Sequence, residues 1–330
     1  MSTHMSTRMS TMRWLIRREL WEHKGAFVYA PLAVAAALVL LLGGGFLYAM
    51  ASSGAFHIQA NGQQVITIEG VPPEMYARAA AIAASSYLAI TAPLFLVLPV
   101  VAFFYCLAAL HDDRRDRSIL FWKSLPMSDR ETVLSKAAVA LVVAPLLTVA
   151  IGIATSLVLL VIGLLASAIK GINLIAPVLA NADFYLSPLY LLGFLPLYIL
   201  WALPTVGWLL LVSSWARSKV FLWAVGVPLV SLALLAWFDF LVGRFSGLSL
   251  NVKWFGEEVV ARLLGGLMPG IWFGEVNGRA LAEQNAGIDG PMLLGLSYGT
   301  LASPAVWVAA VAGCAMIYGA IQLRRWRDEG

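Results

Sequence analysis

The charged stretch 111–131 holds the side chains in this chain that are best suited to bind a partner. Ten of its twenty-one residues are charged, whereas the whole chain is only 12% charged. Asp113 and Arg117 stand four residues apart, so they can pair on one face of a helix. An apolar group follows, formed by Ile119, Phe121, Trp122 and Leu125. Charged residues around an apolar centre are typical of a docking surface, although a solvated loop whose arginines only set the membrane orientation has the same composition.

Two signals divide this stretch into parts. Pro126 forces a bend, because the residue before a proline is disfavoured in the helical region. Ser128 and Glu131 have the spacing of a capping box, which predicts that a second helix begins there and continues into the next apolar segment. We therefore expect two short helices that meet at a corner outside the membrane.

The apolar segments on both sides of the loop predict an all-α, polytopic membrane protein. The 330 residues are 61% hydrophobic, with a mean hydropathy of +0.83, a balance that water-soluble domains of this size do not have. We expect one transmembrane domain over 26–330 with six spans. The expected spans are 27–50, 86–110, 134–166, 189–212, 220–242 and 304–323. The third is longer than the roughly 20 residues that a span needs, so we expect it to tilt or to project beyond the membrane.

The distribution of lysine and arginine predicts the orientation. Both termini, the loop 111–131 with Lys136 just after it, and the turn 215–219 together carry sixteen of the 22 cationic residues, which leaves six for the opposite side. Lysine and arginine concentrate on the cytoplasmic side of membrane proteins, so we expect the termini and this loop to be cytoplasmic. The same bias accounts for the net charge of +4, and no basic domain for nucleic acid is present.

The N-terminal region predicts a helix that lies at the membrane surface. Residues 1–11 have the composition of a disordered leader, and 12–25 form the expected interfacial helix. Trp14 and Trp21 stand seven apart and share a side of such a helix. Arg17 and Arg18 flank that side, and their charged ends can extend to the headgroups. An ordinary positively charged anchor for the first span is the alternative.

The segments 51–85 and 243–303 are expected to lie outside the cytoplasm. Asn61-Gly62 suits a two-residue turn and predicts a small β-hairpin at 56–67. Apolar residues in 252–267 share one helical face, with Glu258 and Arg262 paired on the opposite face. A break at Pro269-Gly270 and an apolar patch follow. This element is expected either to enter the outer leaflet as a re-entrant hairpin or to lie on the membrane as a cap.

The sequence lacks the common motifs of catalysis and nucleotide binding. It has no phosphate-binding glycine loop, no His-Glu-x-x-His and no Gly-x-Ser-x-Gly, and its four histidines have no metal-ligand spacing. The spans hold almost no ionisable residue at depth; Lys136 is expected to extend back to water. Carriers driven by protons or sodium usually have charges or broken helices near the midplane. We therefore predict no catalytic, cofactor or metal residue, and energy supplied by another subunit.

One segment carries a family resemblance: Asp113-Arg-Arg-Asp-Arg-Ser-Ile-Leu-Phe-Trp-Lys-Ser-Leu-Pro126, followed by Ser128-Asp129 and Leu134-Ser-Lys136. It resembles the corresponding segment of bacterial type-2 ABC transporter permeases. In that family this segment is the coupling helix, which docks on the ATP-binding subunit. The resemblance implies docking residues Asp113, Arg114, Arg115, Arg117, Phe121, Trp122, Leu125 and Pro126. It also fits the overall layout of an interfacial helix, six spans and an outer re-entrant element.

The resemblance further implies a function and its partners. The chain would be the permease subunit of an ATP-driven transporter in the bacterial inner membrane and not an enzyme by itself. It would pair with a second permease protomer, identical or related, and with a separate ATPase subunit that binds ATP and Mg²⁺. Few fixed charges in the spans favour export of a hydrophobic or amphiphilic cargo such as a drug, peptide or lipid. The alternative is a membrane scaffold or sensor that recruits a cytoplasmic partner through 111–131.

Overall fold

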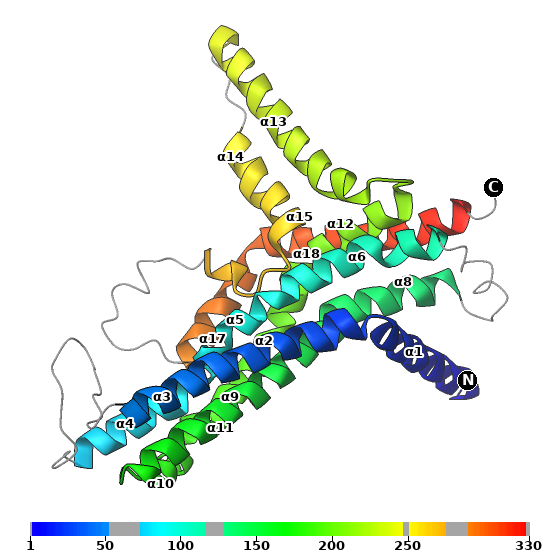
Figure 1. The fold of residues 1–330 in the computed structure, drawn as a ribbon. Helices are drawn as coiled ribbons and strands as arrows, with labels where there is room; N and C mark the ends of the chain where they lie inside the picture. Colours follow the sequence, from blue (N-terminus) through cyan, green and yellow to red (C-terminus); the bar gives the residue numbers. More distant parts are fainter. Residues whose placement is uncertain (1, 53–72, 116–127, 247–250, 275–289, 328–330) are drawn as a thin grey trace.

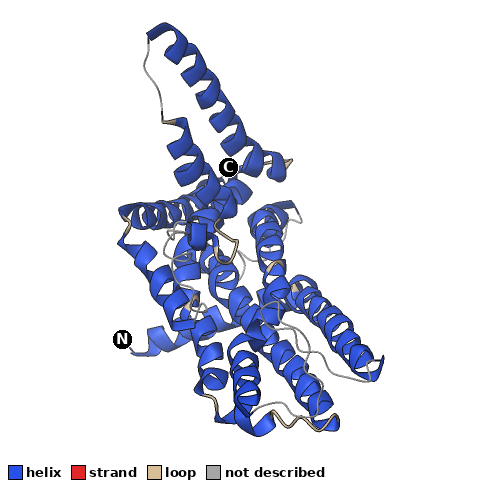
Figure 2. Ribbon diagram, turned by 90° about the vertical axis from the view of Figure 1, so that its left-hand side faces the viewer, coloured by secondary structure: helices blue, strands red, loops and turns tan. Residues whose placement is uncertain are grey.

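The computed structural model describes residues 2–52, 73–115, 128–246, 251–274 and 290–327 (Figure 1). Within these ranges the secondary structure is helical and contains no strand (Figure 2). The hairpin predicted at 56–67 and most of the charged loop, 116–127, lie outside the described residues.

Six helical runs are long and apolar enough to cross a membrane, as predicted, and they support a multi-pass membrane protein. The runs are Gly25–Ser52, Ala92–Arg115, Asp129–Ile169, Ala182–Trp215, Val220–Arg244 and Pro304–Trp326. The third has 41 residues and is the longest of the six, which agrees with the predicted extension beyond a minimal span.

Several of these runs combine more than one helical element. The first comprises η1 (Gly25–Tyr29), α2 (Ala30–Leu38), η2 (Val39–Gly43) and α3 (Gly44–Ser52), and the second comprises α5 (Ala92–Phe95) and α6 (Val97–Arg115). The third comprises α8 (Asp129–Ala138), η4 (Val139–Val143) and α9 (Ala144–Ile169), and the fourth α11 (Ala182–Gly193) and α12 (Leu195–Trp215). The fifth is α13 (Val220–Ser246) and the sixth α18 (Pro304–Arg327).

Shorter helices surround the spans. They are α1 (Ser2–Glu22), α4 (Pro73–Ser86), η3 (Tyr87–Thr91), α10 (Ile175–Ala180), α17 (Gly290–Gly299) and η7 (Thr300–Ala302). The start of α1 at Ser2 differs from the prediction of a disordered leader over 1–11. This segment contains no glycine or proline, so nothing in its sequence interrupts the helix.

The core of the bundle is built around α12, which packs against α6, α8 and α18. The contact between α12 and α18 is close because two glycines meet there: a Cβ at Gly207 would lie 2.5 Å from the carbonyl oxygen of Gly313. Glycines allow such close helix packing in membranes. In contrast, α13 is largely exposed and leans away from the other spans, with α14 (Val252–Trp254) beside it (Figure 1).

The predicted outer element is a broken helix followed by an apolar turn. It comprises α14, η5 (Phe255–Val260) and α15 (Ala261–Gly265), then a turn at Gly270 (φ +84°) and η6 (Ile271–Gly274). Arg262 pairs with Glu258 at 2.9 Å, as its spacing predicts. The Arg262 side chain is buried, and its guanidinium lies 4.5 Å from the ring centre of Trp201.

Candidate functional site

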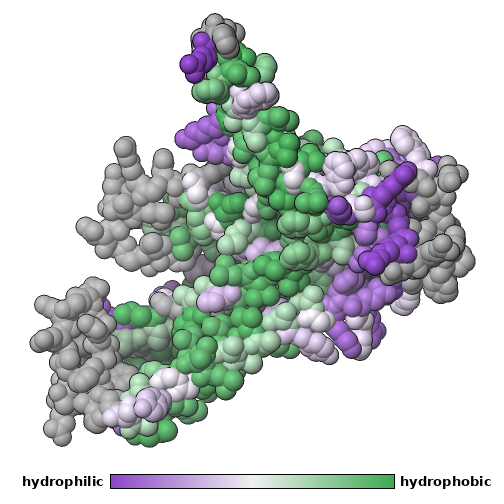
Figure 3. All heavy atoms as spheres, turned by 45° about the horizontal axis from the view of Figure 1, so that its top comes forward, coloured by the Kyte–Doolittle hydropathy of each residue, from purple (hydrophilic) through white to green (hydrophobic). Residues whose placement is uncertain are grey.

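The ends of α6, α12 and α18 and the start of α8 meet at one end of the bundle, which we call the loop end. Figure 3 shows apolar side chains along the spans and hydrophilic side chains gathered toward this end. The charged loop leaves from α6 after Arg115 and returns at Ser128. The predicted capping box is confirmed: the amide of Glu131 donates to Ser128 Oγ at 3.3 Å, and the amide of Ser128 donates to Glu131 Oε2 at 3.0 Å.

Three of the eight predicted docking residues lie in the described part of the chain: Asp113, Arg114 and Arg115. The other five lie outside the described residues: Arg117, Phe121, Trp122, Leu125 and Pro126. Their docking role stays a prediction. What the structure describes is how the two ends of this loop are held.

Arg324 joins both ends of the loop. Its Nη1 lies 3.2 Å from Asp113 on α6, and its Nε lies 3.1 Å from Asp129 on α8. The Arg324 side chain is 7% exposed. A guanidinium offers several donors in a fixed plane and can therefore bind two carboxylates at once. As a result, the last helix of the chain is bound to the end of the second span and to the start of the third.

Lys136 extends this network to the N-terminal helix. Its Nζ lies 3.0 Å from Glu19 Oε1 on α1 and 3.4 Å from Asp113 Oδ2. Glu19 also accepts a hydrogen bond of 3.0 Å from the hydroxyl of Tyr105. The prediction that Lys136 extends to water is therefore wrong, because Glu19 and Asp113 provide its counter-charges inside the protein. Sequence reasoning missed Glu19 and Arg324, although a lysine at the edge of a span indicates that a nearby carboxylate is needed.

Glu19, Glu22 and His23 are the described residues whose geometry comes nearest to a metal site. Their ligand atoms lie within 4.8 Å of one another. However, the Glu19 carboxylate already binds the Lys136 ammonium, and Glu22 pairs with Arg18 at 2.8 Å. A cation here would be repelled by Lys136, so these residues do not indicate a metal site.

The predicted interfacial helix places its two tryptophans as the spacing indicates. Trp14 and Trp21 are 52% and 63% exposed, while Leu15 and Glu19 are buried on the other side of α1. Arg17 is exposed, and Arg18 forms the pair with Glu22. An exposed aromatic face beside a packed face fits a helix at a membrane surface.

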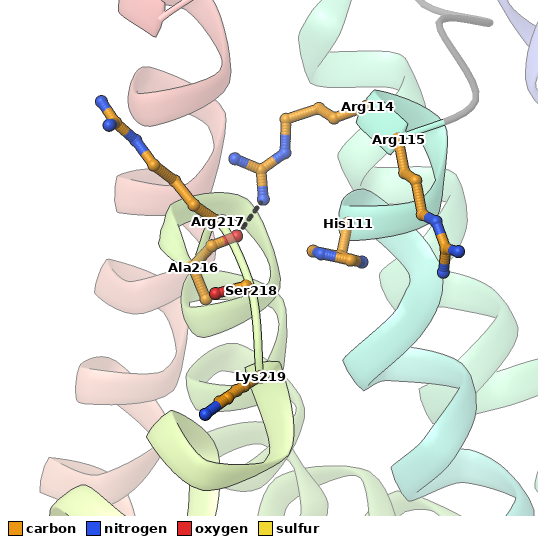
Figure 4. Close-up of a pocket in the computed structure, with 7 residues that line it drawn as sticks. All are labelled: His111, Arg114, Arg115, Ala216, Arg217, Ser218 and Lys219. Carbon is orange, nitrogen blue, oxygen red and sulfur yellow. Dashed lines mark hydrogen bonds between the residues drawn. The ribbon is translucent and has the colours of Figure 1, made fainter.

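A basic pocket lies beside the loop ends, between α6 and the turn from α12 to α13 (Figure 4). Its volume is about 550 Å³. It is lined by His111, Arg114, Arg115, Ala216, Arg217, Ser218 and Lys219. Arg114 is held against the end of α12, because its Nη2 donates to the carbonyl oxygens of Ser213 and of Ala216, the latter at 3.0 Å.

No protein-family model, curated protein or solved structure matches this chain. The resemblance of the charged loop to type-2 ABC permeases therefore stays a prediction. The fold alone does not define an activity, because function depends on the chemistry of the site.

An apolar cavity of about 450 Å³ lies toward the opposite end of the bundle, between α6, α9, α12 and η6. Five aromatic rings line it, from Phe95, Phe194, Tyr198, Trp272 and Phe273, and no charged residue does so among the described residues. The buried hydroxyl of Tyr198 has no hydrogen-bond partner in the described part of the chain. Such a cavity suits an apolar molecule that carries a polar group.

Proposed function

We propose that this chain is the membrane-spanning permease subunit of an ATP-driven ABC transporter. In this proposal the loop end faces the cytoplasm of a bacterium, and a separate ATP-binding subunit docks on the loop 111–131. Phe121, Trp122 and Leu125 supply the apolar centre of the docking surface and the neighbouring charges supply its rim.

The observation that carries this proposal is the ionic network at the ends of the loop. Asp113 and Asp129 both bind Arg324, and Asp113 also binds Lys136, which pairs with Glu19. A force applied to the loop by an ATPase subunit would act on α6 and α8 directly. Because of these ion pairs, α18 and α1 would move with them. A loop that only sets membrane orientation needs no such connection.

The cavity lined by aromatic rings supports the proposed cargo class. It combines five aromatic rings with the buried Tyr198 hydroxyl, a combination that suits a hydrophobic or amphiphilic cargo better than an ion. A second permease protomer, identical or related, completes the translocation path in this proposal.

Co-purification from native membranes tests the docking. We expect the full-length chain to retain an ATP-binding cassette protein in stoichiometric amount, and Trp122→Ala to lose it. Trp237→Ala is the matched control, because Trp237 is 62% exposed on α13 and we expect it to retain the partner. Both variants should keep the wild-type unfolding temperature.

Two outcomes would contradict the proposal. A stoichiometric kinase or assembly factor in place of the ATPase would support the scaffold or sensor alternative. ATP hydrolysis by the purified chain without a partner would show that its energy source is internal.

A further inference from the structure

The basic pocket is not used by the ionic network that carries the proposed coupling. Five of its seven lining residues are cationic or ionisable: His111, Arg114, Arg115, Arg217 and Lys219. No carboxylate lines it within the described ranges. The neighbouring Asp112 lies outside the lining and interacts with His111 Nδ1 at 3.2 Å. Like charges that share one cavity repel one another, and a bound anion would relieve this repulsion.

Three of these cations are available to such an anion. Arg115, Arg217 and Lys219 are exposed, and none forms an ion pair with a described carboxylate. They come from both walls: Figure 4 shows Arg115 on α6, and Arg217 and Lys219 on the turn that leads into α13. Arg114 has a different role, since its bonds to two carbonyl oxygens hold α6 against the end of α12.

The backbone of the turn adds to the positive potential of the pocket. Lys219 has φ +52°, which places it in the left-handed region and directly ahead of α13. The first N–H groups of an α-helix have no partner within the helix and favour negative charge. The turn therefore brings these groups to the same wall as the Arg217 and Lys219 side chains.

The surroundings of the pocket indicate a lipid. It lies where two spans end, at Arg115 and Trp215, and where a third begins, at Val220. Trp215 and Trp223 are about half exposed and pack with ring centres 4.8 Å apart. Tryptophans with this exposure are typical of the headgroup layer.

An apolar surface continues from the pocket along α13. Phe221 and Leu222, in the first turn of α13, are 49% and 60% exposed. An anion that brings its own hydrocarbon chains can thus place its charge in the pocket and its chains on this surface. A soluble anion would bind in the pocket but would leave the apolar surface of α13 uncovered.

We propose that the basic pocket binds the phosphate of an anionic phospholipid, with its acyl chains along the exposed apolar surface of α13. Basic pockets between transmembrane helices bind phospholipid headgroups by the same combination of charges. The proposal requires neither an ATPase subunit nor a particular cargo, so it is independent of the proposed function.

Native mass spectrometry of the full-length chain with added lipid tests this site. Phosphatidylglycerol and phosphatidylcholine with identical acyl chains are titrated separately, and the ratio of their apparent dissociation constants gives the preference. The pocket variant is Arg115→Gln/Arg217→Gln/Lys219→Gln. The matched control, Arg13→Gln/Lys24→Gln/Arg325→Gln, also removes two arginines and one lysine, but from exposed positions outside the pocket. Unfolding temperatures verify that both variants are folded.

We expect the wild-type chain to prefer phosphatidylglycerol. In the pocket variant the ratio of the two dissociation constants should fall about tenfold, and in the control it should fall less than about twofold. A pocket variant that keeps the preference would overturn the proposal. Equal losses in both variants would do so too, since they would indicate only general attraction between charges.

Two further measurements test the other ligands that this pocket could bind, a soluble anion and a protein partner. Inorganic phosphate is titrated against the chain in phosphatidylcholine; binding of phosphate without competition by phosphatidylglycerol would show a site for a soluble anion and overturn the lipid assignment. The pocket variant is also purified from native membranes. If it loses a protein partner but keeps its phosphatidylglycerol preference, the pocket is a protein-docking surface and the proposal is wrong.

Discussion

Lys136 Nζ and Glu19 Oε1 form an ion pair of 3.0 Å, and both side chains are at most 3% exposed. The two residues come from distant parts of the chain, one at the start of the third span and one on the N-terminal helix. In such a buried pair each charge depends on its partner, because the loss of one leaves the other uncompensated in a medium of low dielectric constant.

We expect Lys136→Met to lower the free energy of unfolding by about 3–5 kcal/mol, because Glu19 would then keep a buried charge without its ammonium partner. The Tyr105 hydroxyl and the more distant His23 ring would remain beside it. Thermal or denaturant unfolding of the purified chain in detergent measures this. Lys253→Met is the control: Lys253 has 84% side-chain exposure and lies 3.8 Å from Glu257, so no measurable change is expected. The double variant Glu19→Gln/Lys136→Met should recover part of the loss; additive losses would show that the pair is not coupled.

Gly207→Ala should weaken the packing of α12 on α18. The added Cβ would lie 2.5 Å from the carbonyl oxygen of Gly313, so the two helices must separate. We expect a loss of about 1–3 kcal/mol in the free energy of unfolding. Gly226→Ala makes the same change on α13, where a Cβ would meet nothing within 4 Å, and it should be neutral. Equal stability of the two variants would contradict the close approach.

Several features of this fold were predictable because they depend on neighbours in the sequence. The hydropathy of a segment depends on its local composition, and the six predicted spans match the six helical runs. The capping box at Ser128 and the ion pair of Arg262 with Glu258 also depend on short spacing, and both are confirmed.

The partners of Lys136 and the burial of Arg262 depend on how distant helices pack. Glu19 meets Lys136 only because α1 packs against α8, and Arg262 is buried only because α15 packs on α12 at Trp201. Spacing within one helix predicts which residues share a face but not what covers that face. The sequence therefore predicted the charged loop as a site but not the network that holds its ends.

Thr205→Val should loosen the outer element from α12. The Thr205 hydroxyl donates to the carbonyl oxygen of Arg262 at 2.6 Å and accepts from the amide of Gly266 at 3.1 Å, and all of these groups are buried. Valine has a similar shape but removes both of these buried hydrogen bonds, so we expect a loss of about 1–3 kcal/mol. Thr148→Val is the control in the same unfolding assay.

Thr148 is a suitable control because it is also buried but bonds only within its own helix, to the carbonyl oxygen of Ala144 at 3.0 Å. That carbonyl also lies within the helical hydrogen-bond pattern, so the substitution should have little effect. A loss as large for Thr148→Val as for Thr205→Val would show that the cost comes from the buried hydroxyl itself and not from the link between helices.

Arg324→Gln should separate ATP hydrolysis from movement of the spans, if the proposed function holds. The variant keeps the loop 111–131 intact, so the ATP-binding subunit should still bind. Because Asp113 and Asp129 would lose the guanidinium that joins them, α18 should no longer follow the loop. Spin labels at Val311 on α18 and at Val230 on α13, a helix outside the ionic network, are both at exposed positions. Their distance reports the movement of α18 in a background of Cys106→Ala/Cys314→Ala.

In the wild-type background we expect ATP to change the distance between these labels, and in Arg324→Gln we expect hydrolysis to continue with the distance change abolished. Arg325→Gln removes the neighbouring exposed arginine and should behave as wild type. Arg324→Lys keeps the charge but lacks the planar fork that binds two carboxylates at once, so it should fold and still be uncoupled. A full distance change in Arg324→Lys would show that charge alone is enough. Loss of the ATP-binding subunit from Arg324→Gln would instead place Arg324 in the docking surface.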